Sequence, residues 1–278
     1  MLKALLARLH QGHRTIGFPA AAPTLPKGFQ GRPELRMGLC AEDCRRCCDT
    51  CPTDAISRTP SGCTLDLGRC LFCGECAEAC SSHAIRFGQE YRMAARTRSG
   101  LRLEGPEYQL AEAIDNESRR LFGRSLKFRQ VSAGGCNACE ADINVLSTVV
   151  FDLGRFGIEI VASPRHADGL IVTGPVPENM RLALLKTWEA TPSPKLLIAV
   201  GSCAISGGPF RGHPEVHGGV TDLLPVDLFI PGCPPHPITI LDGLLRLLGR
   251  QNTLPQPRKG PEKPITSTRI TSTKSNGV

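Results

Sequence analysis

The chain of 278 residues has few aromatic side chains and no long apolar run. Aromatic residues make up 5% of it, with one Trp and two Tyr. That leaves no stripe of basic residues interleaved with aromatics, the pattern on which nucleic-acid bases stack. The longest apolar stretches, such as Leu196–Val200, are far shorter than the roughly 20 residues that cross a bilayer. The sequence therefore argues against a nucleic-acid partner and against a membrane-spanning segment.

The N-terminal sequence MLKALLARLHQGHRTIGFP also lacks the apolar core, the small-residue cleavage site and the twin-arginine pattern of an export signal. The chain nevertheless has 14 cysteines. In a protein that is not exported, so many cysteines favour metal binding over disulfides, because thiolate ligands must stay reduced. We therefore expect a cytoplasmic metal protein.

Twelve of the cysteines fall into three sets of four with the spacing of iron–sulfur ligands. Two runs lie near the N-terminus and the third set is dispersed: Cys40, Cys44, Cys47 and Cys51; Cys70, Cys73, Cys76 and Cys80; Cys136, Cys139, Cys203 and Cys233. In the bacterial ferredoxin run, Cys-x-x-Cys-x-x-Cys-x-x-x-Cys, the fourth cysteine ligates the other cluster. The two runs therefore predict a crossed pairing: Cys40, Cys44, Cys47 and Cys80 at a first cluster, and Cys70, Cys73, Cys76 and Cys51 at a second.

Zinc is the alternative metal, because four cysteines also bind it tetrahedrally. The regular spacing of the second run favours an iron–sulfur cluster. The first run is less regular, since three residues separate Cys40 from Cys44 where the pattern has two. Cys48 is a candidate substitute ligand there. Otherwise Cys48 and Cys63 are expected to pack as small buried residues.

The sequence predicts five segments. Leu2, Leu5, Leu6 and Leu9 share one face of a predicted N-terminal helix, which could dock on lipid, dock on another subunit, or cap its own domain. The segments are residues 1–38, an amphipathic helix and an extended arm; 39–90, a two-cluster ferredoxin domain; 91–125, a helical connector; 126–250, a third-cluster domain; and 251–278, a flexible basic tail.

From residue 126 onward, short β-rich runs alternate with helical stretches. Strands are predicted at 127–131, 158–162, 170–173, 196–201 and 227–231, and helices near 137–153, 178–190 and 236–249. This alternation predicts an α/β fold, a parallel sheet with helices on both faces, in which ligands bind beyond the carboxyl ends of the strands. Cys136, Cys203 and Cys233 each follow a predicted strand, so we expect them to converge. Glu140, beside them, is a candidate proton relay or a simple partner of a helix N-terminus.

Four motifs then occur in order: GGCNACE, PRHAD-x-LIVTGPV, GSCA-x-SGGPF and PGCPP. Together they resemble the electron-transfer small subunit of membrane-bound, energy-converting [NiFe] hydrogenases, a family related to the terminal-cluster subunit of respiratory complex I. Residues 27–92, with KGFQGRPEL, DLGRCLFCGECAEAC and FGQEYRMA, resemble the two-cluster ferredoxin subunit of formate hydrogenlyase-type complexes. The chain looks like a fusion of the two.

The resemblance implies a flavodoxin-like C-terminal domain that binds a third cluster through Cys136, Cys139, Cys203 and Cys233, and thus three [4Fe-4S] clusters in all. It also implies a place on the cytoplasmic face of the inner membrane. The partners would be a [NiFe] hydrogenase-like large subunit with the catalytic centre, membrane ion-pumping subunits, and an electron donor such as ferredoxin or a formate dehydrogenase module.

The Cys-x-x-Cys-Glu spacing at Cys136 favours the hydrogenase type, because complex I relatives carry two adjacent cysteines at this point. One alternative is delivery of electrons to a quinone in a complex I-like or nickel-free hydrogenase-related complex. A second alternative is a free-standing ferredoxin-like carrier.

Overall fold

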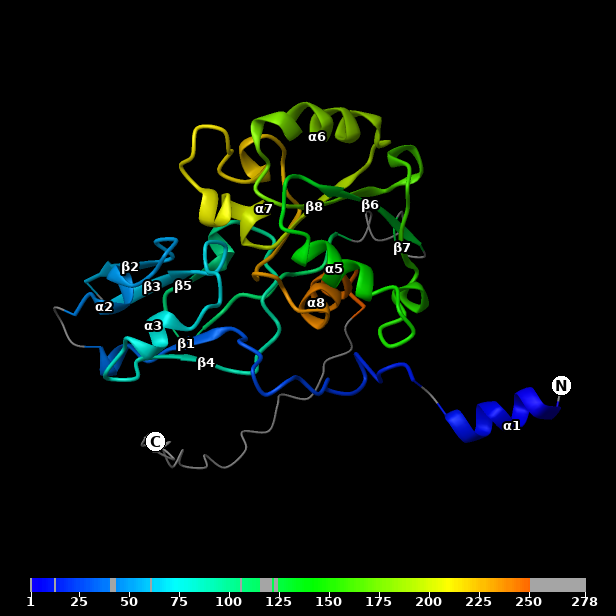
Figure 1. The fold of residues 1–278 in the computed structure, drawn as a ribbon, viewed down its shortest axis with the longest axis horizontal. Helices are drawn as coiled ribbons and strands as arrows, with labels where there is room; N and C mark the ends of the chain where they lie inside the picture. The colour runs from blue at the N-terminus through cyan, green and yellow to red at the C-terminus, as the bar shows by residue number, and fades with distance from the viewer. Residues whose placement is uncertain are drawn as a thin grey trace, which may run out of the picture.

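The computed structural model describes residues 2–250 except 13, 41–43, 61, 106, 116–121 and 123–124. The predicted tail, residues 251–278, lies outside the described residues. Figure 1 shows a larger α/β part, here called the sheet unit (residues 126–248), beside a smaller part, the cysteine unit (residues 33–103).

The sheet unit is built on five parallel strands. They are β6 (Leu126–Ser132), β7 (Ile158–Ile160), β8 (Gly169–Thr173), β9 (Leu196–Val200) and β10 (Leu228–Ile230). All five strands predicted from the sequence are present, in the order β10-β9-β8-β6-β7. Numbered along the chain, this is the 2-1-3-4-5 order of a doubly wound sheet such as flavodoxin. The order reverses between β6 and β8, where such sheets bind ligands.

Helices cover both faces of this sheet (Figure 1). On one face, α5 (Ala138–Val145) and α8 (Pro237–Leu247) pack against the side chains of Phe128 and Ile171. On the other, α6 (Glu178–Ala190) places Leu184 against a second core that includes Val172. Every residue of β8 and β9 is buried, because a parallel strand between two helical layers meets apolar side chains on both sides.

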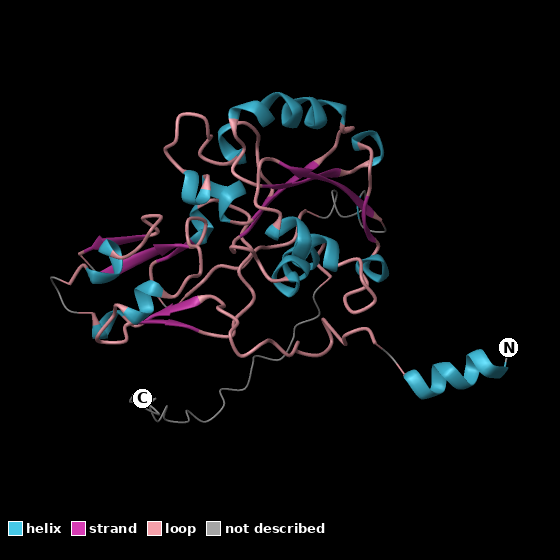
Figure 2. Ribbon diagram, viewed as in Figure 1, coloured by secondary structure: helices cyan, strands magenta, loops and turns pink. Residues whose placement is uncertain are grey.

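The cysteine unit has little regular structure (Figure 2). Its two small antiparallel sheets pair β1 (Pro33–Leu35) with β4 (Ile85–Phe87), and β2 (Ile56–Thr59) with β3 (Gly62–Asp66) and β5 (Arg102–Leu103). Its helices, α2 (Arg46–Asp49) and α3 (Glu75–Glu78), are single turns. One buried core runs on from this unit to the α6 side of the sheet unit, so the two pack as neighbours.

The helical connector expected over 91–125 is wrong for residues 91–115, which contain a 3-10 turn (Ser99–Leu101) and β5 but no α-helix. The segment instead runs extended between the units. The backbones of Ala95 and Phe229 exchange hydrogen bonds of 3.0 and 2.9 Å at the edge of the parallel sheet. Pairing with two sheets satisfies the backbone polar groups that a helix would have satisfied internally.

The N-terminal helix α1 (Leu2–Gln11) stands clear of the rest of the molecule (Figure 1). It has no buried residue, and Leu2, Leu5, Leu6 and Leu9 are 70%, 57%, 56% and 74% exposed. The structure therefore does not show the helix capping its own domain. Among the described residues, no helix has the length and apolar character needed to cross a bilayer.

Candidate metal centres

The four cysteines of the second predicted set line one cavity. Cys51 enters it from the loop after α2, and Cys70, Cys73 and Cys76 enter from the loop that leads into α3. The structure therefore brings Cys51 to the other run, away from the three cysteines that precede it in its own.

The first predicted set also lines a single cavity, of about 60 Å³. Cys40, Cys44 and Cys47 meet Cys80 there, and a fifth cysteine, Cys63 on β3, lines the same cavity. The Cys63 sulfur lies 3.9 Å from those of both Cys40 and Cys47. Sequence reasoning left Cys63 without a role. Its place on a strand that alternates its faces beside two ligand runs was the signal available.

Cys48 stands beside this cavity. Its sulfur lies within 4.8 Å of those of Cys47 and Cys63. The position is compatible with its predicted place as a substitute ligand, although Cys48 does not line the cavity itself.

The third set comes together at the carboxyl edge of the parallel sheet. Cys136 follows β6, Cys139 begins α5, Cys203 lies in α7 (Ser202–Ser206) after β9, and Cys233 follows β10. Burial raises the pKa of the Cys139 thiol, and the neighbouring Glu140, Cys203, Cys233 and Cys136 add to the rise. The predicted convergence of these cysteines is therefore present in the fold.

The cavities offer a chemistry that fits an iron–sulfur or zinc centre. Burial raises the pKa of Cys70 and of Cys76 to about 12, and the other thiols of the set add to this. Thiolates so placed are unfavourable unless a cation neutralises them. Four soft sulfur donors per cavity are the donor set of such metals. Backbone amides also point at the sulfurs: Ala55 N lies 3.3 Å from Cys51 Sγ and Ala84 N lies 3.2 Å from Cys80 Sγ.

The three sets lie in a row. The first and second share α2 and α3, because Cys47 and Cys51 flank one turn while Cys76 and Cys80 flank the other. Burial raises the pKa of the Cys233 thiol, and Cys136 and Cys73 contribute to the rise against a lowering hydrogen bond from Ser202. Cys73 of the second set is therefore a close neighbour of Cys233 in the third. Such a row is the arrangement that stepwise electron transfer requires.

Glu140 is buried at the start of α5, between the ends of β6 and β8. Its Oε1 accepts hydrogen bonds from Ser132 Oγ at 2.6 Å and Thr173 Oγ1 at 2.7 Å. Hydroxyl partners are what a buried carboxylate needs to remain in place. Its predicted role as a proton relay stays a prediction.

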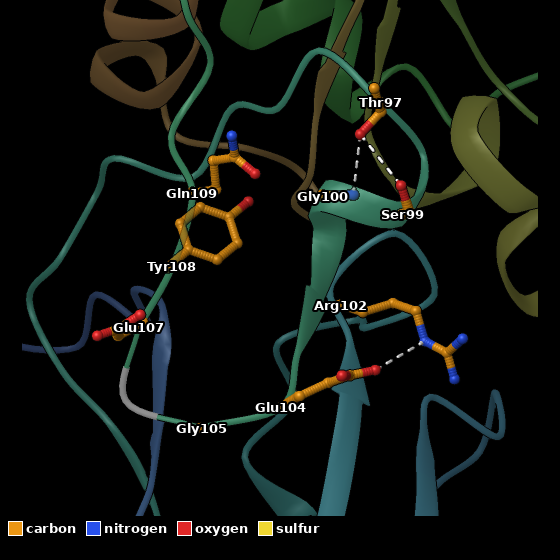
Figure 3. A pocket seen from close by; sticks show the side chains of 9 residues that line it. All are labelled: Thr97, Ser99, Gly100, Arg102, Glu104, Gly105, Glu107, Tyr108 and Gln109. Carbon is orange, nitrogen blue, oxygen red and sulfur yellow. Dashed lines mark hydrogen bonds and ion pairs between the residues drawn. The ribbon is translucent and has the colours of Figure 1, made fainter.

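The widest hollow among the described residues lies elsewhere. It is an open cleft of about 1230 Å³ between β5 and the segment 107–109, and Figure 3 shows that polar side chains such as Arg102, Glu104 and Tyr108 line it. No cysteine borders it. Its lining offers no donor set comparable to the thiol cavities.

Comparison with known proteins bears on the sheet unit. The chain is 46% identical over 126 residues to formate hydrogenlyase subunit 7 of Escherichia coli, which covers 45% of this chain and 49% of that protein. It is 41% identical to the probable membrane-bound hydrogenase subunit mbhJ of Pyrococcus furiosus, over 46% of this chain and 77% of that one. It is also 41% identical to an NADH-quinone oxidoreductase subunit of Heliobacterium modesticaldum, over 41% and 66%.

The chain thus spans about half the length of the formate hydrogenlyase relative and about three quarters of the archaeal one. These relatives are subunits of oxidoreductases by name. The family described as the 20 kDa subunit of NADH ubiquinone oxidoreductase matches residues 136–247, a stretch that begins at Cys136 and includes all four cysteines of the third set. The chain belongs to the family of the NADH ubiquinone oxidoreductase 20 kDa subunit.

Proposed function

We propose that this chain is an electron-transfer subunit that carries three [4Fe-4S] clusters in a membrane-bound, energy-converting hydrogenase of the formate hydrogenlyase type. The observation that carries the proposal is the row of three four-cysteine sets, which ends at the carboxyl edge of the sheet that belongs to this family. Electrons would pass between a low-potential donor, the first and second sets, the third set and a [NiFe] site in a partner large subunit.

The proposed division of the chain supports this path. Residues 39–90 form a two-cluster ferredoxin domain fused to the third-cluster domain of residues 126–250, a combination of what are otherwise two subunits. The cavities lined by crossed cysteine runs support this assignment. So does the proximity of Cys73 to Cys233, because it leaves a short step from one domain to the other.

The residues of this chain hold and surround the clusters. Cys40, Cys44, Cys47 and Cys80 would hold the first, Cys51, Cys70, Cys73 and Cys76 the second, and Cys136, Cys139, Cys203 and Cys233 the third. The clusters supply one-electron redox chemistry when bound. Backbone amides near the sulfurs stabilise negative charge on them, and the tight turns fix the ligands so that little rearranges on reduction. Glu140, held by Ser132 and Thr173, would pass or hold a proton beside the third cluster.

The partners follow from the same proposal. They are a [NiFe] hydrogenase-like large subunit, ion-pumping membrane subunits, and a donor such as ferredoxin or a formate dehydrogenase module. The chain would lie on the cytoplasmic face of the inner membrane. The exposed leucine face of α1 supports attachment to lipid or to a membrane subunit. This attachment also argues against a free-standing carrier, which has no use for such a face.

The decisive experiment is the metal content of the native complex, isolated from detergent-solubilised membranes through this chain. We expect about twelve iron atoms per chain from three four-iron clusters, stoichiometric nickel from the partner, and hydrogen-dependent reduction of a dye. Elution of this chain alone, without partner subunits, would favour the free carrier instead.

A second candidate is the delivery of electrons to a quinone in a complex I-like or nickel-free hydrogenase-related complex. The 41% identity to a subunit of an NADH-quinone oxidoreductase favours it. The same isolation separates the two, because this candidate predicts the iron without the nickel and without reduction of the dye by hydrogen.

A further inference from the structure

The first cysteine cavity differs from the others in having a cation at its sulfurs. Arg58 Nη1 donates a hydrogen bond to Cys40 Sγ at 2.9 Å and lies 3.7 Å from Cys63 Sγ. Arg58 on β2 and Cys63 on β3 are directly paired across the antiparallel hairpin. Paired residues point to the same face, so the hairpin presents both side chains to the cavity together.

Cys63 is the second unusual feature of this cavity. It is buried, and its thiol is within hydrogen-bonding distance, 3.9 Å, of the sulfurs of Cys40 and Cys47. The crossed runs already supply four ligands at this site, so the fifth thiol is available as a donor. With one proton, it can donate to one of the two ligand sulfurs at a time.

The second cavity has only neutral partners of this kind. Cys51 Sγ accepts from the amide of Ala55 and Cys70 Sγ accepts from the amide of Phe72, each at 3.3 Å. In the part of the chain that the structure describes, no charged side chain is recorded as a donor to the second or third cysteine set. The two cavities are thus similar in ligands and different in the charge around them.

We propose that Arg58 and Cys63 set the reduction potential of the first cluster and hold it above that of the second. This rests on the proposed function, in which these cysteine sets bind iron–sulfur clusters. Reduction adds negative charge to a cluster and its ligand sulfurs. A guanidinium and a thiol donor at those sulfurs stabilise the reduced form, and hydrogen bonds to the sulfurs are among the features that set such potentials.

The consequence is an order of filling. The first cavity lies at the far end of the row from the third set, and its cluster would accept the first electron that enters the chain. An electron would therefore rest at the outer end until a second one arrives.

The test is a redox titration of the anaerobically purified full-length chain, followed by electron paramagnetic resonance, with the iron content of each variant. Arg58→Gln should keep its iron and lower the potential of the highest-potential cluster by at least tenfold in the equilibrium constant, which is 59 mV for one electron. Cys63→Ala should lower it by less, and Cys63→Ser, which retains a donor, should recover part of the difference.

Arg86→Gln is the matched control, because it removes the same charge from an exposed position on β4 in the same unit. Its potentials should equal those of the unaltered chain. Unchanged potentials in Arg58→Gln with full iron would overturn the proposal. Loss of one cluster in Cys63→Ala would also overturn it, by making Cys63 a ligand. An unaltered chain without iron–sulfur signals would instead refute the proposed function.

Discussion

The two units of this protein bring their cysteines together in different ways. In the cysteine unit, eight predicted ligands lie between residues 40 and 80, and loops around two single-turn helices place them. In the sheet unit, four predicted ligands are spread from residue 136 to residue 233, and the ends of three parallel strands bring them together. The first site depends on local spacing and the second on topology.

The difference extends to what stabilises each unit. The strands of the cysteine unit have two to five residues, and four of its cysteines, Cys47, Cys63, Cys70 and Cys76, are part of its buried core. The sheet unit has a core of leucine, isoleucine, valine and phenylalanine around α5 and α8, to which only Cys139 is added, at its margin. The metal is therefore expected to stabilise the first unit much more than the second.

The largest effect should follow removal of iron. We expect the cysteine unit to lose its structure in the chelated chain while the parallel sheet remains, because metal binding supplies folding free energy where the apolar core is small. Hydrogen exchange followed by mass spectrometry measures this, with fast exchange expected in residues 44–87 and protection retained in β8 and β9. Equal protection in both units after removal would show that the comparison is wrong.

A smaller effect is expected from Gly201→Ala, which acts on the third set alone. Gly201 has φ +88°, and an added Cβ would lie 2.6 Å from Cys139 Sγ. An alanine there costs about 1–2 kcal/mol for its backbone alone and displaces a predicted ligand. We expect loss of about four iron atoms per chain, one four-iron cluster, with the signals of the first two clusters retained.

Gly28→Ala is the control for this substitution, since Gly28 has nothing within 4 Å of an added Cβ and no positive φ. It should retain all its iron. Full iron in Gly201→Ala would mean that Cys139 is not a ligand, or that the site adapts more than its packing suggests.

Sequence reasoning succeeded where the determinants are local or periodic. The strands of the sheet unit follow from apolar runs such as Gly169–Thr173, and the convergence of Cys136, Cys203 and Cys233 follows from the rule that ligands gather at the carboxyl ends of parallel strands. The crossed pairing of the two runs followed from spacing, and the cavities group the same cysteines.

It failed where distant partners decide. The segment after residue 91 has alanines and charges that suit a helix, yet Ala95 pairs with Phe229 and Ala111 with Ala94. Cys63 was assigned only to packing, because its neighbours Cys40 and Cys47 are set by a hairpin register that no local spacing reveals. In both cases the information lies in pairings between strands.

The next effect concerns the contact between the units. Ser206 Oγ, buried in α7, donates to the carbonyl of Gly68 at 2.9 Å, and Ile205 beside it packs close to the same glycine. Ser206→Ala would leave that buried carbonyl without its partner, at a cost of about 1–2 kcal/mol. Chemical denaturation of the iron-loaded chain measures this, and Ser99→Ala, at a position outside the buried core, serves as the control. An unchanged midpoint would show that the units do not stabilise each other through this contact.

The smallest effect is expected at the rim of the same contact, where Arg211 Nη2 lies 3.1 Å from Asp54 Oδ2. The Asp54 side chain is 80% exposed, so water and salt screen the pair and it should contribute at most about 1 kcal/mol. Asp54→Asn is the suitable change, because Asp54 has φ +50° and asparagine tolerates that conformation. The loss should shrink as ionic strength rises and should vanish in the Arg211→Gln background. A loss as large as that of Ser206→Ala, or one that salt leaves unchanged, would mean that charge at the rim, and not burial at Gly68, joins the two units.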